Sequence, residues 1–160
     1  MSMRKQFAKL LYSEMNQNKN IFVLTGDLGY GVWDQIRLDY SNRFLNVGSS
    51  EQLMLGIAIG MAMEGKIPFV YSTTPFLLYR PFEWIRNYLD NEKIPVKLIG
   101  GGRGKEDYGD LGFTHYAEED KEVMRVFKNI VSFAPEKDNL EEALKTSISN
   151  NLPTYINLKK

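Results

Sequence analysis

Arg-Phe-Leu-Asn-Val-Gly-Ser-Ser-Glu-Gln-Leu-Met-Leu-Gly-Ile-Ala-Ile-Gly-Met-Ala-Met-Glu, residues 43–64, is the stretch of sequence that decides the fold. Its first apolar residues, 44–47, predict a short strand, which Gly48 ends. Gln52 follows Ser49 at the three-residue spacing of a capping box, a common start of helices. We therefore expect a strand, a turn and then a helix that begins directly after the serines.

The predicted helix, residues 51–64, is apolar on nearly every face. A helix without a solvated side is normally buried on all sides. Gly56 and Gly60 stand four apart, a spacing that lets another backbone approach closely. Either this chain's sheet or another subunit can supply that backbone, and the apolar surface favours a subunit interface. Glu51 begins the helix, where an acid either complements the helix dipole or serves as a catalytic carboxylate.

The composition excludes several classes of protein. A chain of 160 residues suits one domain with a sizeable core, and we expect a single domain over residues 1–160. Lys and Arg (20) balance Asp and Glu (20), which gives no reason to expect nucleic acid or an anionic membrane as a partner. The absence of cysteine excludes disulfides and a thiol nucleophile, and fits a cytoplasmic protein. No apolar run reaches membrane-spanning length.

Short apolar strands alternate with helices along the rest of the chain. The predicted strands are residues 21–24, 67–71, 96–99, 130–133 and 154–158, and the predicted helices are residues 3–15, 32–40, 80–90, 117–127 and 138–149, with a loop over 100–114. This alternation predicts an α/β fold of three layers, in which a mostly parallel sheet has helices on both faces.

Ligands of such sheets bind outside the carboxyl ends of the strands, and several predicted strand ends carry polar or aromatic residues. Asp27 follows the first strand, Glu51 the second, Phe76 and Tyr79 the third, and His115 closes the loop after the fourth. Aromatic residues there either cover the core or stack on a flat ring. The single histidine suits a structural role or proton transfer. The pattern predicts a site without naming its chemistry.

Other motifs are missing or have an ordinary interpretation. There is no Walker lysine pattern, no Gly-x-Gly-x-x-Gly after a strand, and no cluster of metal ligands, so we expect no metal site in this chain. Glu119 and Asp120 begin the predicted helix 117–127, where acids complement the helix dipole.

Several ordered blocks of the sequence match one family of enzymes. They are Leu-Thr-Gly-Asp-Leu (24–28), Arg-Phe-Leu-Asn-Val-Gly-x-x-Glu-Gln-x-Met (43–54), Gly-Lys-Ile-Pro-Phe (65–69), Arg-Pro-Phe-Glu-x-Ile-Arg-Asn (80–87), Val-Lys-Leu-Ile-Gly (96–100), Tyr-Gly-x-Leu-Gly-x-Thr-His (108–115), Glu-Asp-x-x-x-Met-Arg (119–125) and Pro-x-Tyr-Ile (153–156). Over nearly its whole length the chain resembles the pyrimidine-binding domain of transketolase, and most closely the carboxyl-terminal subunit of split, two-gene transketolase-like enzymes.

The resemblance implies a role for each matching residue. Glu51 matches the catalytic glutamate that hydrogen-bonds a ring nitrogen of the thiamine diphosphate aminopyrimidine and so assists removal of the thiazolium proton. Phe76 matches the aromatic residue that stacks on this ring, and Tyr79 the aromatic residue one turn later. Asp27 matches an acid near the thiazolium. His115 matches a catalytic histidine that contacts oxygen atoms of the substrate.

Two arginines are further candidates for substrate binding. Arg4 matches a basic residue near the substrate channel, and Arg103 stands where the family has a histidine and can supply a different anion contact. The other departures from the family pattern are Leu111 for an acid, Thr73 for the first aromatic of the pyrimidine pocket, Ala134 for a sugar-phosphate arginine and Gly31 for a phosphate-binding serine. They indicate an unusual sugar substrate, whereas the residues for cofactor activation are present.

The family holds the diphosphate through Mg²⁺ with a Gly-Asp-Gly motif and a later Asn, and this chain has no such motif. The resemblance therefore implies that a separate N-terminal transketolase subunit holds the diphosphate and Mg²⁺, with the site at the interface of an α2β2 heterotetramer. The expected activity is transfer of a two-carbon ketol unit between sugars. Two alternatives stay open: a subunit of a deoxyxylulose-phosphate synthase-like or 2-oxo-acid dehydrogenase-like thiamine enzyme, and a cofactor-free α/β binding module.

Overall fold

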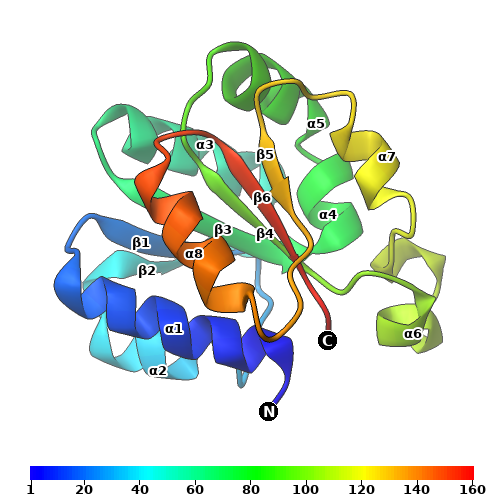
Figure 1. The fold of residues 1–160 in the computed structure, drawn as a ribbon, viewed down its shortest axis with the longest axis horizontal. Helices are drawn as coiled ribbons and strands as arrows, with labels where there is room; N and C mark the ends of the chain where they lie inside the picture. The colour runs from blue at the N-terminus through cyan, green and yellow to red at the C-terminus, as the bar shows by residue number, and fades with distance from the viewer.

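A computed structural model describes all residues of the chain, 1–160, and shows one sheet of six strands (Figure 1). The strands are β1 (Ile21–Thr25), β2 (Phe44–Asn46), β3 (Ile67–Thr73), β4 (Lys97–Gly101), β5 (Val131–Phe133) and β6 (Thr154–Leu158). Every neighbouring pair is parallel, and the strand order is β2-β1-β3-β4-β6-β5. The predicted parallel α/β sheet is therefore confirmed.

Helices cover both faces of the sheet, which completes the three predicted layers (Figure 1). One face packs against α1 (Met3–Gln17), α2 (Asp34–Asp39) and α8 (Leu140–Ser149). The other packs against α3 (Glu51–Met63), α4 (Thr74–Tyr79), α7 (Asp120–Met124) and a π-helical segment (Ile85–Asn91) that continues α5 (Phe82–Trp84). The remaining elements are α6 (Lys105–Tyr108) and three 3₁₀ turns at Ser41–Arg43, Gly109–Leu111 and Phe113–His115.

The inner strands β1, β3, β4 and β6 are largely apolar because both faces of the sheet are covered. Successive side chains of a strand point to opposite faces. In β3, Phe69 and Tyr71 belong to the core beneath α1, while Val70 belongs to the core beneath α3. A continuous apolar run is the expected sequence pattern for such a strand.

The segment after β3 differs from the single helix predicted over residues 80–90. Helix α4 begins earlier, with Pro75 in its first turn, where the missing N–H of a proline costs no hydrogen bond. Pro81 follows α4 and cannot donate to a continuing helix, so α5 starts as a new element. The chain then winds into the π-helical segment.

Other predicted boundaries are correct to within a few residues, with two exceptions. The helix predicted over 117–127 is regular only over α7, Asp120–Met124. The loop predicted over 100–114 contains the end of β4, helix α6 and two 3₁₀ turns. The second exception includes the glycine-rich stretch 100–104, where the sequence shows little periodicity.

Helix α3 has the predicted start, but its capping and burial differ from the prediction. No side chain caps it, and Gln52 Nε2 instead donates to the Arg80 carbonyl at 3.1 Å. The helix is also not buried on all sides within this chain, since Leu53 is 53% exposed and Met63 is 71% exposed. A Cβ added to Gly56 would meet the Trp84 ring at 3.2 Å, so intrachain packing explains this glycine.

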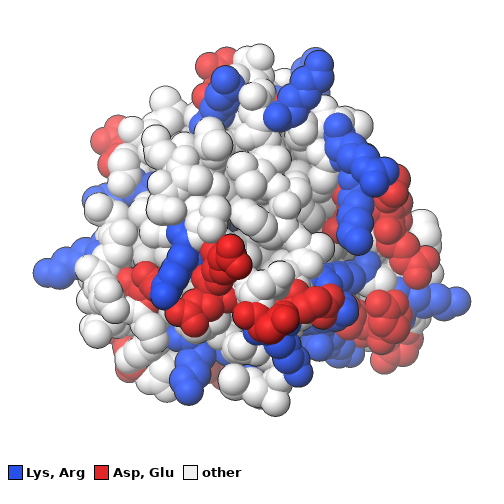
Figure 2. Space-filling model, viewed as in Figure 1, with Lys and Arg blue, Asp and Glu red and all other residues white.

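The surface charges of the molecule are mixed. On the face shown in Figure 2, basic and acidic side chains alternate around the periphery, and the central area is largely uncharged. None of the helices combines the length and the hydropathy that crossing a lipid bilayer requires.

Candidate active site

The strand order reverses between β1 and β3, which is where a sheet of this kind forms its crevice at the carboxyl ends of the strands. From β1 the chain passes to β2 on one side and then crosses over to β3 on the other. Open α/β sheets bind ligands where the order reverses in this way, at the carboxyl ends of the strands. Gly26 directly follows β1, and Ser72 lies near the end of β3. The start of α3 reaches this crevice.

Glu51 places a buried carboxylate over the crevice. The residue is 2% exposed, and its Oε1 accepts a hydrogen bond from Ser72 Oγ at 3.1 Å. A Cβ added to Gly26 would lie 3.3 Å from Glu51 Oε1, so the glycine lets the chain pass close to this acid. Arg80 Nη1 donates to Glu51 Oε2 at 2.7 Å. Burial of an ionised carboxylate without partners destabilises the fold, and the hydrogen bonds from Ser72 and Arg80 offset this loss of stability.

Phe76 lies beside the same arginine, and His115 lies beside Phe76. The Arg80 guanidinium carbon is 3.7 Å from the centre of the Phe76 ring, in a cation–π contact. The rings of Phe76 and His115 meet edge-on, with their centres 5.1 Å apart. His115 Nδ1 also forms a hydrogen bond with Thr114 Oγ1 at 2.9 Å. Arg80 thus links Glu51 to Phe76, and Phe76 in turn contacts His115.

Tyr79 closes one side of this group. Phe76, Tyr79 and Arg80 line a cavity of about 320 Å³ with residues of the segment 113–119. Tyr79 Oη donates to Glu119 Oε1 at 2.6 Å. Burial and then this hydrogen bond raise the pKa of the Tyr79 hydroxyl, so it stays protonated and keeps α4 attached to the start of α7. Glu119 therefore does more than complement the dipole of its helix.

Asp27 lies on the loop after β1, as predicted, but is not joined to Glu51 by a hydrogen bond. Its φ of 59° is in the left-handed region. Its Oδ1 accepts hydrogen bonds from Tyr30 Oη (2.5 Å) and Asn46 Nδ2 (3.2 Å). These bonds, the one from Tyr30 first, lower the pKa of the Asp27 carboxyl. The carboxylate is held on the loop after β1 in its ionised form.

The two candidate arginines are both engaged within the chain. Arg4 Nη1 donates to Tyr108 Oη at 2.5 Å, which links α1 to α6. Arg103 donates to the carbonyls of Pro135 and Asn157 and, at 3.0 Å, to Glu136 Oε1. No hydrogen bond joins either arginine to Glu51 or His115. In this structure Arg103 fastens the loop after β4 to the ends of β5 and β6.

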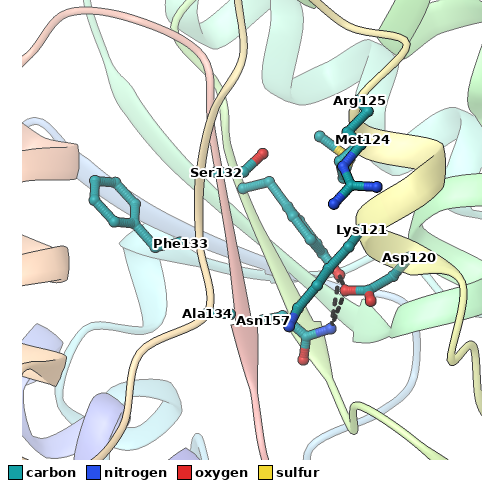
Figure 3. A pocket seen from close by; sticks show the side chains of 9 residues that line it. Asp120, Lys121, Met124, Arg125, Ser132, Phe133, Ala134 and Asn157 are labelled. Carbon is teal, nitrogen blue, oxygen red and sulfur yellow. Dashed lines mark hydrogen bonds between the residues drawn. The ribbon is translucent and has the colours of Figure 1, made fainter.

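A second buried polar cluster lies between α7 and the strands β5 and β6 (Figure 3). Asp120, 5% exposed, accepts hydrogen bonds from Tyr155 Oη at 2.9 Å and from Asn157 Nδ2, which also donates to Tyr155 Oη. The cluster borders a cavity of about 290 Å³, whose lining includes Lys121 and Arg125. The interpretation of Asp120 as a helix-dipole acid is therefore incomplete.

The departures from the family pattern occupy different environments. Thr73 is buried, and its hydroxyl has no hydrogen-bond partner. Leu111 is exposed, and Ala134 lines the cavity beside Asp120. A side chain at Gly31 would meet no atom, although its φ of 72° disfavours one.

Sequence reasoning missed Arg80 and Ser72, the two partners of Glu51. Arg80 lies 29 residues after Glu51 and Ser72 lies 21 residues after it, so no local pattern connects them. One signal was available: a buried glutamate at a helix start requires a counter-charge, and Arg80 opens the block Arg-Pro-Phe-Glu that follows the third strand.

Comparisons with known proteins point to one family. The family described as "Transketolase, pyrimidine binding domain" matches residues 1–160. A protein of Methanocaldococcus jannaschii, named as a transketolase C-terminal section, is 31% identical over 99% of this chain and 50% of its own length. A subunit of the apulose-4-phosphate transketolase of Actinobacillus succinogenes is 36% identical over 75% of this chain and 39% of its own length.

A solved structure agrees with the sequence comparisons. The structure titled "Split gene transketolase, inactive beta4 tetramer" is 32% identical and superposes with a TM-score of 0.86. The match covers 99% of this chain and 51% of that one. The chain thus spans about half or less of the length of these relatives.

Proposed function

This chain belongs to the transketolase pyrimidine-binding domain family, and we propose that it is the carboxyl-terminal, pyrimidine-binding part of a thiamine diphosphate-dependent transketolase. The proposed reaction transfers a two-carbon ketol unit between sugars. The observation that carries the proposal is the buried Glu51 carboxylate at the β1/β3 crevice, which Arg80 links to the face of Phe76.

The residues of the site suit the aminopyrimidine end of this cofactor. The Arg80 guanidinium, a flat group with several N–H donors, lies on Phe76 and bonds to Glu51. A second flat, nitrogen-containing group therefore finds both a stacking surface and a hydrogen-bonding carboxyl group here. When bound, thiamine diphosphate supplies the nucleophilic carbon and the electron sink of the reaction.

The chain's own residues orient the reactants and handle a proton. We assign Glu51 to a hydrogen bond with a ring nitrogen, with its carboxyl oxygen as the proton-holding atom. Phe76 stacks on the ring, and Tyr79 holds α4 in place through Glu119. His115, whose ring touches the edge of Phe76, faces the substrate oxygens. Asp27 is assigned to the thiazolium side.

The arginines are assigned to the substrate. Arg4 lies at the start of α1, and a substrate anion near it would compete with the hydroxyl of Tyr108. Arg103 has Glu136 as its one charged partner, so a contact with an anionic substrate requires exchange of that partner. These two arginines therefore bind the substrate only if it replaces their present partners, Tyr108 and Glu136.

We further propose that a separate chain holds the diphosphate and Mg²⁺, in an α2β2 heterotetramer. Two observations support this assembly. The family's diphosphate motif is missing from the sequence, and α3 exposes Leu53 and Met63 beside Gly60, where an added Cβ would meet no atom. An apolar helix face of this kind suits contact with another subunit. The solved split-gene structure, by its title an inactive tetramer of beta chains, also supports a need for a second chain.

Reconstitution tests the proposal. The chain is purified alone and together with the diphosphate-binding chain, and both samples are assayed with Mg²⁺ and thiamine diphosphate. We expect ketol transfer between ketose and aldose substrates from the pair and none from the chain alone. Decarboxylation of 2-oxo acids without ketol transfer would instead identify a deoxyxylulose-phosphate synthase-like or 2-oxo-acid dehydrogenase-like enzyme.

Calorimetry separates an enzyme from a binding module. Titration of the assembled pair with thiamine diphosphate and Mg²⁺ should show saturable binding. No heat of binding and no activity in the assembled pair would support the cofactor-free α/β module.

A further inference from the structure

We propose that Arg80 is a placeholder for the cofactor ring: in the cofactor-free chain its guanidinium occupies the aminopyrimidine position, and it must leave before the ring can bind. This inference rests on the proposed function, because it assigns the ring to Glu51 and Phe76. It adds a positioning residue to the site and makes cofactor binding an exchange of partners.

The contacts of Arg80 are the same two that the ring needs. Its Nη1 donates to Glu51 Oε2 at 2.7 Å, and its guanidinium carbon lies 3.7 Å from the Phe76 ring centre. The guanidinium is planar, delocalised and rich in N–H donors, and it stacks on aromatic faces. It therefore satisfies a carboxylate and an aromatic face at once, as an aminopyrimidine would.

The guanidinium and the ring cannot be present together on this face of Phe76. Stacked carbon atoms are in contact at about 3.5–4.0 Å, so a ring inserted between Phe76 and Arg80 would need a separation of about 7 Å. The observed 3.7 Å leaves no such space. A ring that stacks on this face must displace Arg80.

Arg80 is placed so that its side chain can leave without unfolding the site. Its side chain is 44% exposed, whereas that of Glu51 is 1% exposed. Its backbone carbonyl accepts a hydrogen bond from Gln52 Nε2 at 3.1 Å, which ties the end of α4 to α3 independently of the guanidinium. Rotation of the side chain into solvent therefore leaves this backbone contact in place.

The placeholder explains how the site stays formed before the cofactor arrives. A buried carboxylate that loses its cation is left uncompensated, which destabilises the fold. Arg80 supplies the cation, and it also covers Phe76, which would otherwise expose an aromatic face. The same contacts compete with the cofactor, so Arg80 should weaken cofactor binding while it stabilises the free chain.

The test measures cofactor affinity and stability in the same variants. Arg80→Met removes the charge and the planar group, Arg80→Lys retains the charge, and Arg86→Met is the matched control because Arg86 is exposed and bonds only to Asn87. Thiamine diphosphate with Mg²⁺ is titrated into each chain assembled with the diphosphate-binding partner. Thermal unfolding is measured on each chain without cofactor.

We expect Arg80→Met to bind the cofactor about tenfold more tightly than the wild type, since loss of a charge-assisted contact of about 1.4 kcal/mol corresponds to a factor of ten. The cofactor-free variant should unfold at a lower temperature than the wild type. Arg80→Lys should lie between the two, and Arg86→Met should match the wild type. Opposite changes of affinity and stability distinguish displacement from a purely structural role, which would lower both.

If the wild type binds the cofactor and Arg80→Met binds it with equal or lower affinity, the placeholder role of Arg80 is wrong. Absence of binding by the wild type and by all variants would overturn the proposed function itself. If Arg80→Met fails to fold, modification of the wild-type pair with phenylglyoxal decides. Cofactor should accelerate modification of Arg80 and leave that of Arg86 unchanged; an unchanged rate at Arg80 would refute the displacement.

Discussion

Glu51 and Asp120 are two buried carboxylates that each begin a helix near the carboxyl ends of the strands, but their partners differ in kind. Glu51 is compensated by the cation of Arg80, a side chain that is nearly half exposed, and by Ser72. Asp120 is compensated by two neutral groups, Tyr155 and Asn157, which are themselves buried in β6.

This difference separates a site that can exchange partners from one that cannot. A cation on a flexible side chain can be replaced at Glu51 by another donor without opening the core. Replacement at Asp120 would require movement of a central strand. The same kind of side chain in the same helical position thus has an exchangeable partner in one place and fixed partners in the other.

The largest effect should come from Glu51→Gln. The amide keeps the size of the side chain but cannot hold the proton, and loss of a general acid–base group typically lowers turnover by about 10²–10⁴-fold. The assay is ketol transfer by the assembled pair at saturating cofactor. Glu64→Gln, at the exposed end of α3, is the control and should retain full turnover. Full turnover of Glu51→Gln would remove Glu51 from the mechanism.

Asp120→Ala should mainly affect stability. It removes the acceptor that Tyr155 Oη and Asn157 Nδ2 share, and only Asn157 Nδ2 retains another, the Tyr155 hydroxyl oxygen. The buried Tyr155 hydroxyl proton loses its acceptor, which costs about 1–3 kcal/mol of unfolding free energy. Denaturant unfolding measures the loss. Glu122→Ala removes only the surface pair with Arg125 and should cost less than about 1 kcal/mol. A variant that keeps its stability but loses turnover would place Asp120 with Glu51 instead.

Tyr155→Phe should change the pH dependence of stability. Burial first and the Asp120 carboxylate second raise the pKa of Tyr155 well above 10. Above about pH 10 the unfolded chain releases this proton and the folded chain retains it, so the free energy of unfolding falls by about 1.4 kcal/mol per pH unit as pH rises. The slope of the phenylalanine variant should be smaller by this amount, while Tyr79 and Tyr108, whose pKa values burial also raises, contribute equally to both proteins. Denaturant unfolding between pH 8 and about 11 compares the two, and parallel profiles would contradict the assignment.

The smallest effect should come from Ser72→Ala. This variant removes one hydrogen bond to Glu51, worth about 1 kcal/mol of unfolding free energy, and leaves the Arg80 contact. Thr73→Val is the matched control, because the neighbouring Thr73 hydroxyl is buried without a partner and its removal should cost nothing. Equal losses in the two variants would show that burial, and not the bond to Glu51, is responsible.

The alternation of apolar runs predicted the sheet, and the acid at the start of α3 predicted one half of the site. Residues 67–71 of β3 form a continuous apolar run because helices cover the strand on both faces, and this run predicted the strand. The segment after it was not predicted correctly, because Pro75 starts one helix and Pro81 ends it within a single apolar stretch. The two prolines therefore interrupt the helical spacing of the apolar residues in this segment.

The partners of the two acids could not be predicted for a different reason. Glu51 and Arg80 meet only after the sheet has aligned β1, β2 and β3, and Asp120 meets Asn157 at a sequence separation of 37 residues. The helix-dipole interpretation fitted both acids equally, since the first turn of a helix is the same local environment in each. Only tertiary contacts distinguish them.

Trp84 and Trp33, the two tryptophans of the chain, lie on opposite faces of the sheet. Trp84 packs on Gly56 of α3, and Trp33 packs edge-on against Tyr71 and Phe7 beneath α1. The protein therefore carries one intrinsic fluorophore for each layer of helices. In Trp33→Phe, tryptophan emission would come only from Trp84, in the helical layer that holds Glu51. In Trp84→Phe it would come only from the opposite layer, so each half of the core could be followed separately during unfolding.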